Sequence, residues 1–97
     1  MAQVSYSTRS LENLERAFEF LAAKDPASAS KAVTAIRAAI EVLAHHPLIG
    51  RMAESGLREL VISYGNTGYV ALYWFVPERD EVIVLAVRHQ RELDYPV

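Results

Sequence analysis

The spacing of apolar residues changes half-way along the chain, from a helical repeat to the alternation and short runs that are typical of strands. In the first half, apolar residues recur every three or four positions, as they do on one face of an α-helix. In the second half, apolar runs are separated by clusters that contain Gly, Pro, Asn or Asp. This change of period predicts a helical layer followed by a sheet.

A short strand and a first helix are predicted at the start of the chain. Residues 3–7 alternate, with two apolar side chains on one side, which predicts the strand. Thr8 or Ser10 is expected to cap the helix, because a hydroxyl oxygen accepts hydrogen bonds from free N–H groups in the first turn. The helix is expected to close at residues 22–24, with one apolar stripe in the core. That stripe consists of Leu11, Leu14, Phe18 and Leu21.

A second helix is expected to begin at Asp25-Pro26, because Asp is a favoured N-cap and Pro fits the first helical position. Its apolar stripe is also expected in the core. That stripe consists of Val33, Ile36, Ile40 and Leu43. Pro47 ends the helix, since proline does not continue one easily. The short link to the first helix predicts an antiparallel helical hairpin.

The second half of the chain predicts a loop over residues 48–56 and then three strands. The strands are expected at 57–64, 69–76 and 81–87, with turns at 65–68 and 77–80. Short turns between consecutive strands imply antiparallel hairpins. Residues 69–76 are apolar on both faces, so this strand is expected near the middle of the sheet. The predicted fold is α+β, in the order β-α-α-β-β-β, with the helical hairpin packed on a mainly antiparallel four-stranded sheet.

Composition restricts the kinds of function that are expected. The 97 residues are the size of one domain, which we assign to 1–97. Ten Lys and Arg against twelve Asp and Glu give a net charge of −2, which does not predict strong nonspecific binding to nucleic acid. Hydrophobic residues make up 52% of the chain, which suggests either a well-filled core or apolar surface left for a partner.

The chain contains no cysteine, which excludes disulfides and thiol nucleophiles and fits a reducing, bacterial cytoplasmic location. We expect no signal peptide, because no basic segment followed by an apolar run is visible at the start. No apolar run is long enough to span a membrane. The adjacent His45 and His46 are poorly placed to bind one metal ion, so neither a metal site nor a cofactor is expected.

The predicted order of elements, together with several local motifs, resembles the ParE/RelE toxins of bacterial toxin–antitoxin systems, which include plasmid stabilisation systems. The matching segments are His46 to Arg51, Leu57 to Val61, Gly68-Tyr69 with Leu72-Tyr73, and Val87 to Glu92 with Tyr95-Pro96. Each motif alone is weak, whereas their order and spacing over nearly the whole chain form a specific signal. The resemblance implies the same β-α-α-β-β-β fold and a cognate antitoxin, encoded in the same operon, as partner.

The resemblance also implies one of two activities. RelE-like members cleave messenger RNA on the ribosome with basic residues of the sheet and a tail tyrosine, whereas ParE-like members inhibit DNA gyrase and cause growth inhibition. RelE-like nucleases have an arginine where this chain has Val70, and lysines around Val61 and Ser63. Cleavage needs cations that stabilise the charged transition state, so their absence favours the gyrase inhibitor, acting by protein–protein contact.

If the chain is a nuclease instead, the catalytic candidates are His89, Arg91 and Tyr95. His89 has the residue type of a general base near neutral pH, but we favour a histidine that only hydrogen-bonds Glu92 or the backbone. Tyr95 is a candidate proton donor. A family member that has lost toxicity and only binds its partner is a third interpretation.

The candidate partner-binding residues lie in the last strands and the tail. They are Arg88, Arg91, Tyr73, Trp74 and Tyr95. Arg88 and Arg91 form either a cationic patch for an acidic partner or a surface pair with Glu92 and Asp94. Tyr73 and Trp74 point to opposite faces, so at least one is a candidate for an outward contact, although core packing is commoner.

Overall fold

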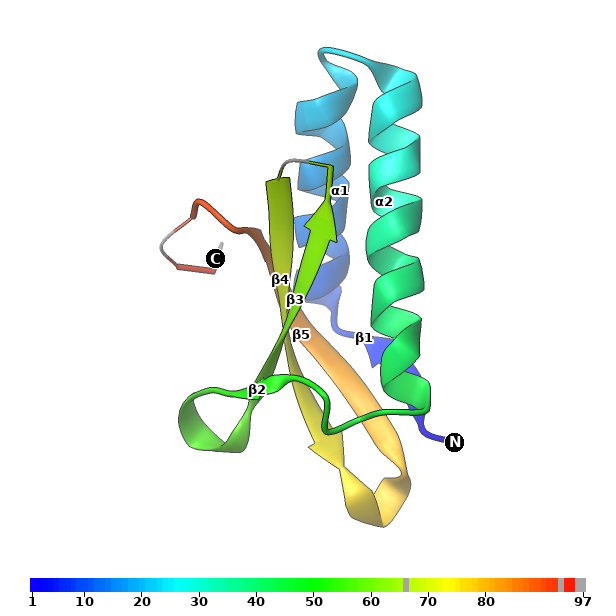
Figure 1. Ribbon diagram of the computed structural model, residues 1–97, viewed down its shortest axis with the longest axis vertical. Helices are drawn as coiled ribbons and strands as arrows, with labels where there is room; N and C mark the ends of the chain where they lie inside the picture. Colours follow the sequence, from blue (N-terminus) through cyan, green and yellow to red (C-terminus); the bar gives the residue numbers. More distant parts are fainter. Residues whose placement is uncertain (66, 93, 96–97) are drawn as a thin grey trace.

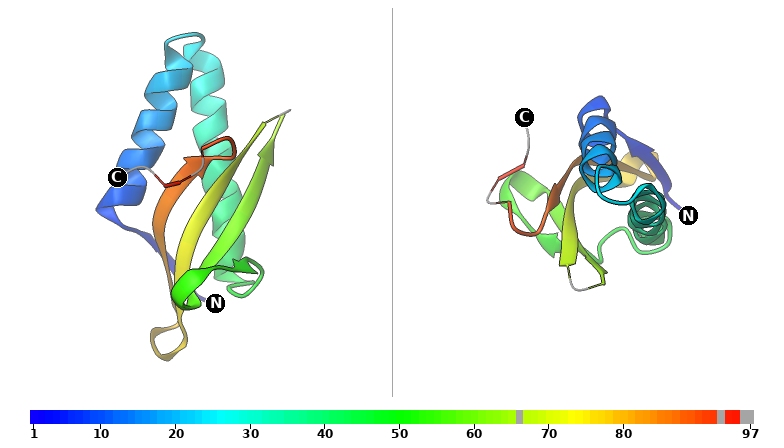
Figure 2. Two further views of the ribbon diagram at one scale, coloured as in Figure 1. Left: turned by 90° about the vertical axis from the view of Figure 1, so that its left-hand side faces the viewer. Right: turned by 90° about the horizontal axis from the view of Figure 1, so that it is seen from above.

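A helical hairpin covers one face of a five-stranded sheet, and the tail of the chain lies on the other face (Figures 1 and 2). The computed structural model describes residues 1–65, 67–92, 94 and 95. Its elements are β1 (Gln3–Tyr6), α1 (Thr8–Ala22), α2 (Pro26–Glu41), η1 (Val42–Ala44), β2 (Arg51–Met52), η2 (Glu54–Gly56), β3 (Arg58–Tyr64), β4 (Thr67–Val76), η3 (Pro77–Arg79) and β5 (Glu81–His89). The predicted α+β fold is confirmed. Among the described residues, no helix combines the length and the apolar character needed to cross a membrane.

The strands lie in the order β1-β5-β4-β3-β2, which places β4 in the middle as predicted. β1 runs parallel to β5, and the other neighbours are antiparallel. The fifth strand, β2, lies within the segment 48–56 that was predicted to be a loop. Only two residues of β2 pair with β3, Arg51 with Glu59 and Met52 with Arg58, and two residues are too few to produce a visible alternation.

The turn between β3 and β4 is tighter than predicted. Tyr64 pairs with Thr67, so residues 67 and 68, which were predicted to be part of the turn, belong to β4. Gly65 has a φ of +59°, which glycine adopts without steric cost. Asn66 of the predicted turn, like Pro96 of the tail motif, lies outside the described residues.

Helix α1 is capped by Ser7, one residue before Thr8 and three before Ser10, the two candidates named from the sequence. The Ser7 Oγ accepts a hydrogen bond from the Ser10 N–H at 3.1 Å and donates one to the Leu85 carbonyl at 3.0 Å. The Ser7 N–H also donates to the Val84 carbonyl at 2.9 Å. Because β1 is held against β5 up to this point, the helix begins directly after the strand.

The face that α1 buries differs from the predicted apolar stripe. Leu14 is buried as expected, but Leu11 and Phe18 are 46% and 38% exposed. Ser10 and Asn13 are buried in their place. These polar side chains have partners, since the Ser10 Oγ donates to the Ser7 carbonyl and the Asn13 Oδ1 accepts from the Val87 N–H at 2.9 Å. Their hydrogen bonds offset the cost of burial and turn α1 toward β5.

Helix α2 follows the prediction closely. Asp25 caps it by accepting hydrogen bonds from the N–H groups of Ala27 and Ser28. Of the predicted stripe, Ile36, Ile40 and Leu43 are fully buried and Val33 is only partly buried. The α-helix ends at Glu41, before the predicted end at Pro47, and Leu43 lies in η1. They pack with residues of β3, β4 and β5 in one core, while α1 lies along β5 and α2 along β3.

Replacing Asn13 by alanine is expected to leave the buried Val87 N–H without an acceptor, which costs about 1–3 kcal/mol of unfolding free energy. Urea denaturation of the two proteins measures the difference. Glu12→Ala, at an exposed neighbouring position, is the control and is expected to change stability by less than about 0.5 kcal/mol. Equal effects of the two substitutions would show that the Asn13 hydrogen bond does not stabilise the fold.

Candidate functional site

Four polar side chains meet on the sheet face opposite the helices: Arg51, Glu59, Arg88 and Tyr95. The Arg51 Nε lies 3.1 Å from the Glu59 Oε1, and the Tyr95 hydroxyl donates to the Glu59 Oε2. The Arg88 Nη2 lies 4.0 Å from the same Oε2, and its guanidinium carbon lies 5.1 Å from the centre of the Tyr95 ring. We call these four residues the tail cluster.

The tail cluster bridges two strands across a third. Glu59 is on β3 and Arg88 on β5, and they lie beside Leu72 and Val70 of β4 respectively. Tyr95, from the tail, interacts with both Glu59 and Arg88. Val70 is only 1% exposed although it lies on the face away from the helices. The position where RelE-like nucleases have an arginine is therefore apolar and covered.

The surroundings of Glu59 and Tyr95 in the tail cluster determine the protonation states of these two residues. The hydrogen bond from Tyr95, with the nearby Arg51 and Arg88, holds the pKa of the Glu59 carboxyl below its usual value, although burial opposes this. Burial, and then the bond to Glu59, raises the pKa of the Tyr95 hydroxyl. Glu59 is therefore an ionised acceptor and Tyr95 a neutral donor at neutral pH.

Arg88 binds the first residues after β5 rather than forming an exposed patch with Arg91. Its side chain is 14% exposed, and its Nη1 donates to the Glu92 carbonyl oxygen at 2.8 Å. Its ion partner is the Glu59 carboxylate, so of the two alternatives considered from the sequence, a cationic patch or a pair with Glu92 and Asp94, neither describes Arg88. Arg88 lies near Glu59 because the two residues are on β5 and β3, the strands that flank β4, and both side chains lie on the face away from the helices.

His89 lies on the opposite, helix-covered face. Its Nδ1 accepts from the Arg91 N–H at 3.0 Å, so its Nε2 has the proton that is directed at the Thr67 Oγ1. Its ring packs edge-on against Tyr69, with centroids 5.2 Å apart. Both ring nitrogens are occupied, as in the hydrogen-bonded interpretation we favoured. Since successive strand residues point to opposite faces, the sheet separates His89 from Tyr95.

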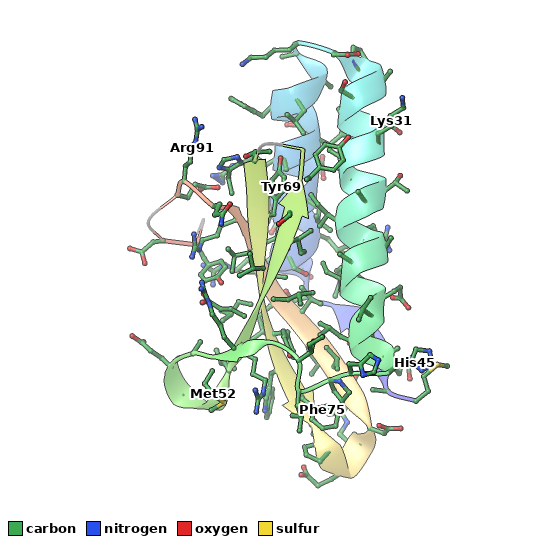
Figure 3. All side chains as sticks on the ribbon, viewed as in Figure 1. Lys31, His45, Met52, Tyr69, Phe75 and Arg91 are labelled. Atoms are coloured by element: carbon green, nitrogen blue, oxygen red, sulfur yellow. The ribbon has the colours of Figure 1, made fainter. Side chains whose placement is uncertain are left out.

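A groove of about 530 Å³ runs between α1 and the end of β5. Apolar and aromatic side chains contribute to its surface, among them Phe20, which is 67% exposed, Tyr69 and Val87. Cationic side chains stand at its rim. They are Arg16 on α1, Lys24 just after α1 and Arg91 after β5, and the acidic Glu92 also lines the groove. Figure 3 shows the Arg91 side chain directed away from the sheet. Sequence analysis missed this groove, because its two sides are far apart in the chain.

Tyr73 and Trp74, the two aromatic partner-binding candidates on β4, differ in exposure. Tyr73 is fully buried: its hydroxyl donates to the Pro47 carbonyl at 2.7 Å and accepts from the Gly50 N–H at 2.9 Å. It anchors the segment after α2 and is not exposed to a partner, so that prediction is wrong for Tyr73. Trp74 is 48% exposed on the face away from the helices. Within the described part of the chain, no three His, Asp or Glu side chains lie together as metal ligands.

Comparisons with known proteins agree with this geometry. Residues 4–94 match the family model described as ParE toxin of type II toxin-antitoxin system, parDE. The chain belongs to the ParE/RelE family of toxins. Over 92 residues, the toxin is 33% identical to a Caulobacter vibrioides protein named Toxin RelE3, covering 95% of this chain and 98% of the relative.

Two solved structures have the same fold as this toxin. A chain of the chromosomal ParDE system from P. aeruginosa superposes with a TM-score of 0.78 and 19% identity, over 92% of this chain and 96% of that one. A chain of the intact E. coli RelBE toxin–antitoxin complex gives a TM-score of 0.67 and 14% identity, over 95% and 100%. The toxin therefore shares its fold with members of both branches.

Stability is expected to depend on the charge of Glu59. Because its pKa is lowered in the folded toxin, its contribution is complete above the pKa of the unfolded chain, near 4.3, and is lost as pH falls further. The difference in unfolding free energy between the wild type and Glu59→Gln, measured in urea, should be constant above pH ~5 and shrink toward pH ~3. Glu54→Gln, at an exposed position, controls for the loss of one negative charge. A difference that is constant over the whole range would contradict this role.

Proposed function

We propose that the toxin inhibits DNA gyrase by protein–protein contact and is neutralised by a cognate antitoxin. The observation that supports this most is the chemistry of the sheet face opposite the helices. At the positions where RelE-like nucleases have basic side chains, this chain has Val61, Ser63 and Val70. Those cations would stabilise a pentacovalent phosphate, and the arginines that this face does have, Arg51 and Arg88, lie against the Glu59 carboxylate instead.

The arrangement of the remaining candidates supports the same proposal. A nuclease built from His89, Arg91 and Tyr95 needs these groups around one phosphate. Here His89 and Arg91 both line the groove on the helix side, whereas Tyr95 donates to Glu59 on the other face of the sheet. The separation of Tyr95 from the other two residues supports a gyrase inhibitor over this nuclease site.

The groove between α1 and the end of β5 is our candidate for antitoxin binding. It combines an exposed aromatic side chain, Phe20, with the cations Arg16, Lys24 and Arg91 at its rim. Such a surface suits an amphipathic segment with apolar and acidic side chains, which folds as it binds. The two structural neighbours come from a ParDE TA system and from the RelBE toxin–antitoxin complex.

Tightly controlled induction of the toxin without antitoxin is expected to arrest growth and to switch on a DNA-damage reporter, because poisoned gyrase leaves broken DNA. With purified gyrase and supercoiled plasmid, the toxin should increase the amount of linear DNA trapped by detergent. Arrest with a silent reporter, and cleavage of messenger RNA on purified ribosomes, would favour the RelE-like alternative.

Two further results would distinguish the alternatives. If the toxin is a nuclease, the triple replacement of His89, Arg91 and Tyr95 by alanine should abolish toxicity. Unchanged toxicity of that variant would exclude those residues as the catalytic set. Absence of any growth arrest would identify a family member that has lost toxicity.

Phe20→Asp is expected to weaken the complex with the antitoxin, tested as the co-expressed product of the neighbouring reading frame, by at least about tenfold, or ~1.4 kcal/mol. Phe20 is exposed, so the toxin itself should remain folded. Val42→Asp, at a 43% exposed position in η1 directly after α2, is the matched control. Isothermal titration gives both affinities, and equal affinities would remove the groove from the proposal.

A further inference from the structure

Strand β3 has an unpaired edge for most of its length. β4 pairs with all of Arg58–Tyr64, but on the other side β2 pairs only with Arg58 and Glu59. Among the described residues, no strand pairs with the outer edge of residues 60–64. Figure 2 shows β3 at the side of the sheet, with the short β2 segment crossing near one end.

The backbone groups on this edge can be assigned from two hydrogen bonds. The Ala53 N–H donates to the Leu57 carbonyl at 2.8 Å, so Leu57 presents its backbone groups to β2, and alternate residues after it face the same way. The Gln90 N–H donates to the Gly68 carbonyl at 2.9 Å, so Gly68 faces β5 and Tyr69 faces Ile62 of β3. Both observations direct the N–H and C=O groups of Val61 and Ser63 away from the sheet.

This edge has none of the usual protection against strand pairing. Natural edge strands are commonly blocked by Pro, Lys, inward charges or a bulge, or are covered by another element. Residues 60–64 contain no proline and no charge, and β3 pairs with β4 in continuous register. The Val61 side chain is 43% exposed on the face away from the helices, whereas Ile62 is buried on the helix side.

We propose that, without antitoxin, two copies of this chain pair through their β3 edges. An antiparallel arrangement about a two-fold axis at Ile62 places Val61 of each copy opposite Ser63 of the other. Both are residues whose backbone groups point outward, so the two pairs form four hydrogen bonds. Neutral side chains face one another across the junction, so no like charges oppose the contact. The sheets of the two copies then form one continuous sheet across the dimer.

The length of the edge fits this register. A partner strand that ends at its own Tyr64 lies opposite Leu60, and the next position along the edge is Glu59, which is already paired with Arg51 of β2. The β3 strand of the partner ends at that point, because its turn begins at Gly65. The segment 60–64 is therefore bounded on one side by β2 and on the other by the hairpin turn, and it is complementary to itself.

Sedimentation velocity of the purified toxin over a range of concentrations tests the proposal. We expect a concentration-dependent dimer in the wild type. Val61→Pro should weaken dimerisation by about tenfold or more, since proline removes one outward N–H and spares the pairing with β4. Ser63→Lys, which adds a charge to the edge, should have the same effect and guards against a folding defect in the proline variant. Leu48→Lys, at an exposed apolar position on another surface, should leave the dimer intact.

Several outcomes would overturn the proposal. A wild type that is monomeric at all concentrations excludes self-pairing. A dimer that Val61→Pro and Ser63→Lys leave unchanged uses another surface. A monomeric toxin whose affinity for the antitoxin falls in both edge variants would assign the edge to an antitoxin strand. The proposal does not rest on gyrase as target, and its failure leaves the result of the gyrase assay unaffected.

Discussion

The two helices can cover only one face of the sheet, and this constraint determines the role of nearly every polar residue in the toxin. At the end of β5, adjacent residues fall on different sides of it. His89 lies between the sheet and α1, where its ring packs on Tyr69, and Arg88 lies on the open side, where it binds the tail and faces Glu59. His89 and Tyr95 are therefore close in sequence but lie on opposite faces of the sheet.

The fold was largely predictable from the sequence because it depends on periodicity. The stripe of Ile36, Ile40 and Leu43, the cap at Asp25 and the central position of β4 follow from local patterns that the structure confirms. The face of α1 was not predictable in the same way. Its orientation depends on Asn13, whose side chain receives a hydrogen bond from Val87, seventy-four positions away. A buried polar residue with a distant partner looks like a surface residue in the sequence.

The candidate site was predictable only in part, for the same reason. Arg51 and Glu59 lie in neighbouring segments of the chain, on the adjacent strands β2 and β3. The link from Glu59 to Tyr95 joins β3 to the tail, and no spacing in the chain indicates it. The groove was invisible from the sequence, since α1 and the residues after β5 form its two sides only in the folded chain. Tyr73 was misassigned because alternation gives the face of a strand residue but not what covers that face.

The contact between Tyr73 and the segment after α2 has a consequence for how this sequence can change. A Cβ atom on Gly50 would lie 2.6 Å from both the ring edge and the hydroxyl oxygen of Tyr73, and 2.9 Å from the Glu59 carbonyl oxygen. The glycine is needed here for space, because the tyrosine hydroxyl occupies the volume that a side chain would take. Substitutions at positions 50 and 73 are therefore expected to depend on each other: a larger residue at 50 fits only if the tyrosine is replaced and the backbone at 59 moves.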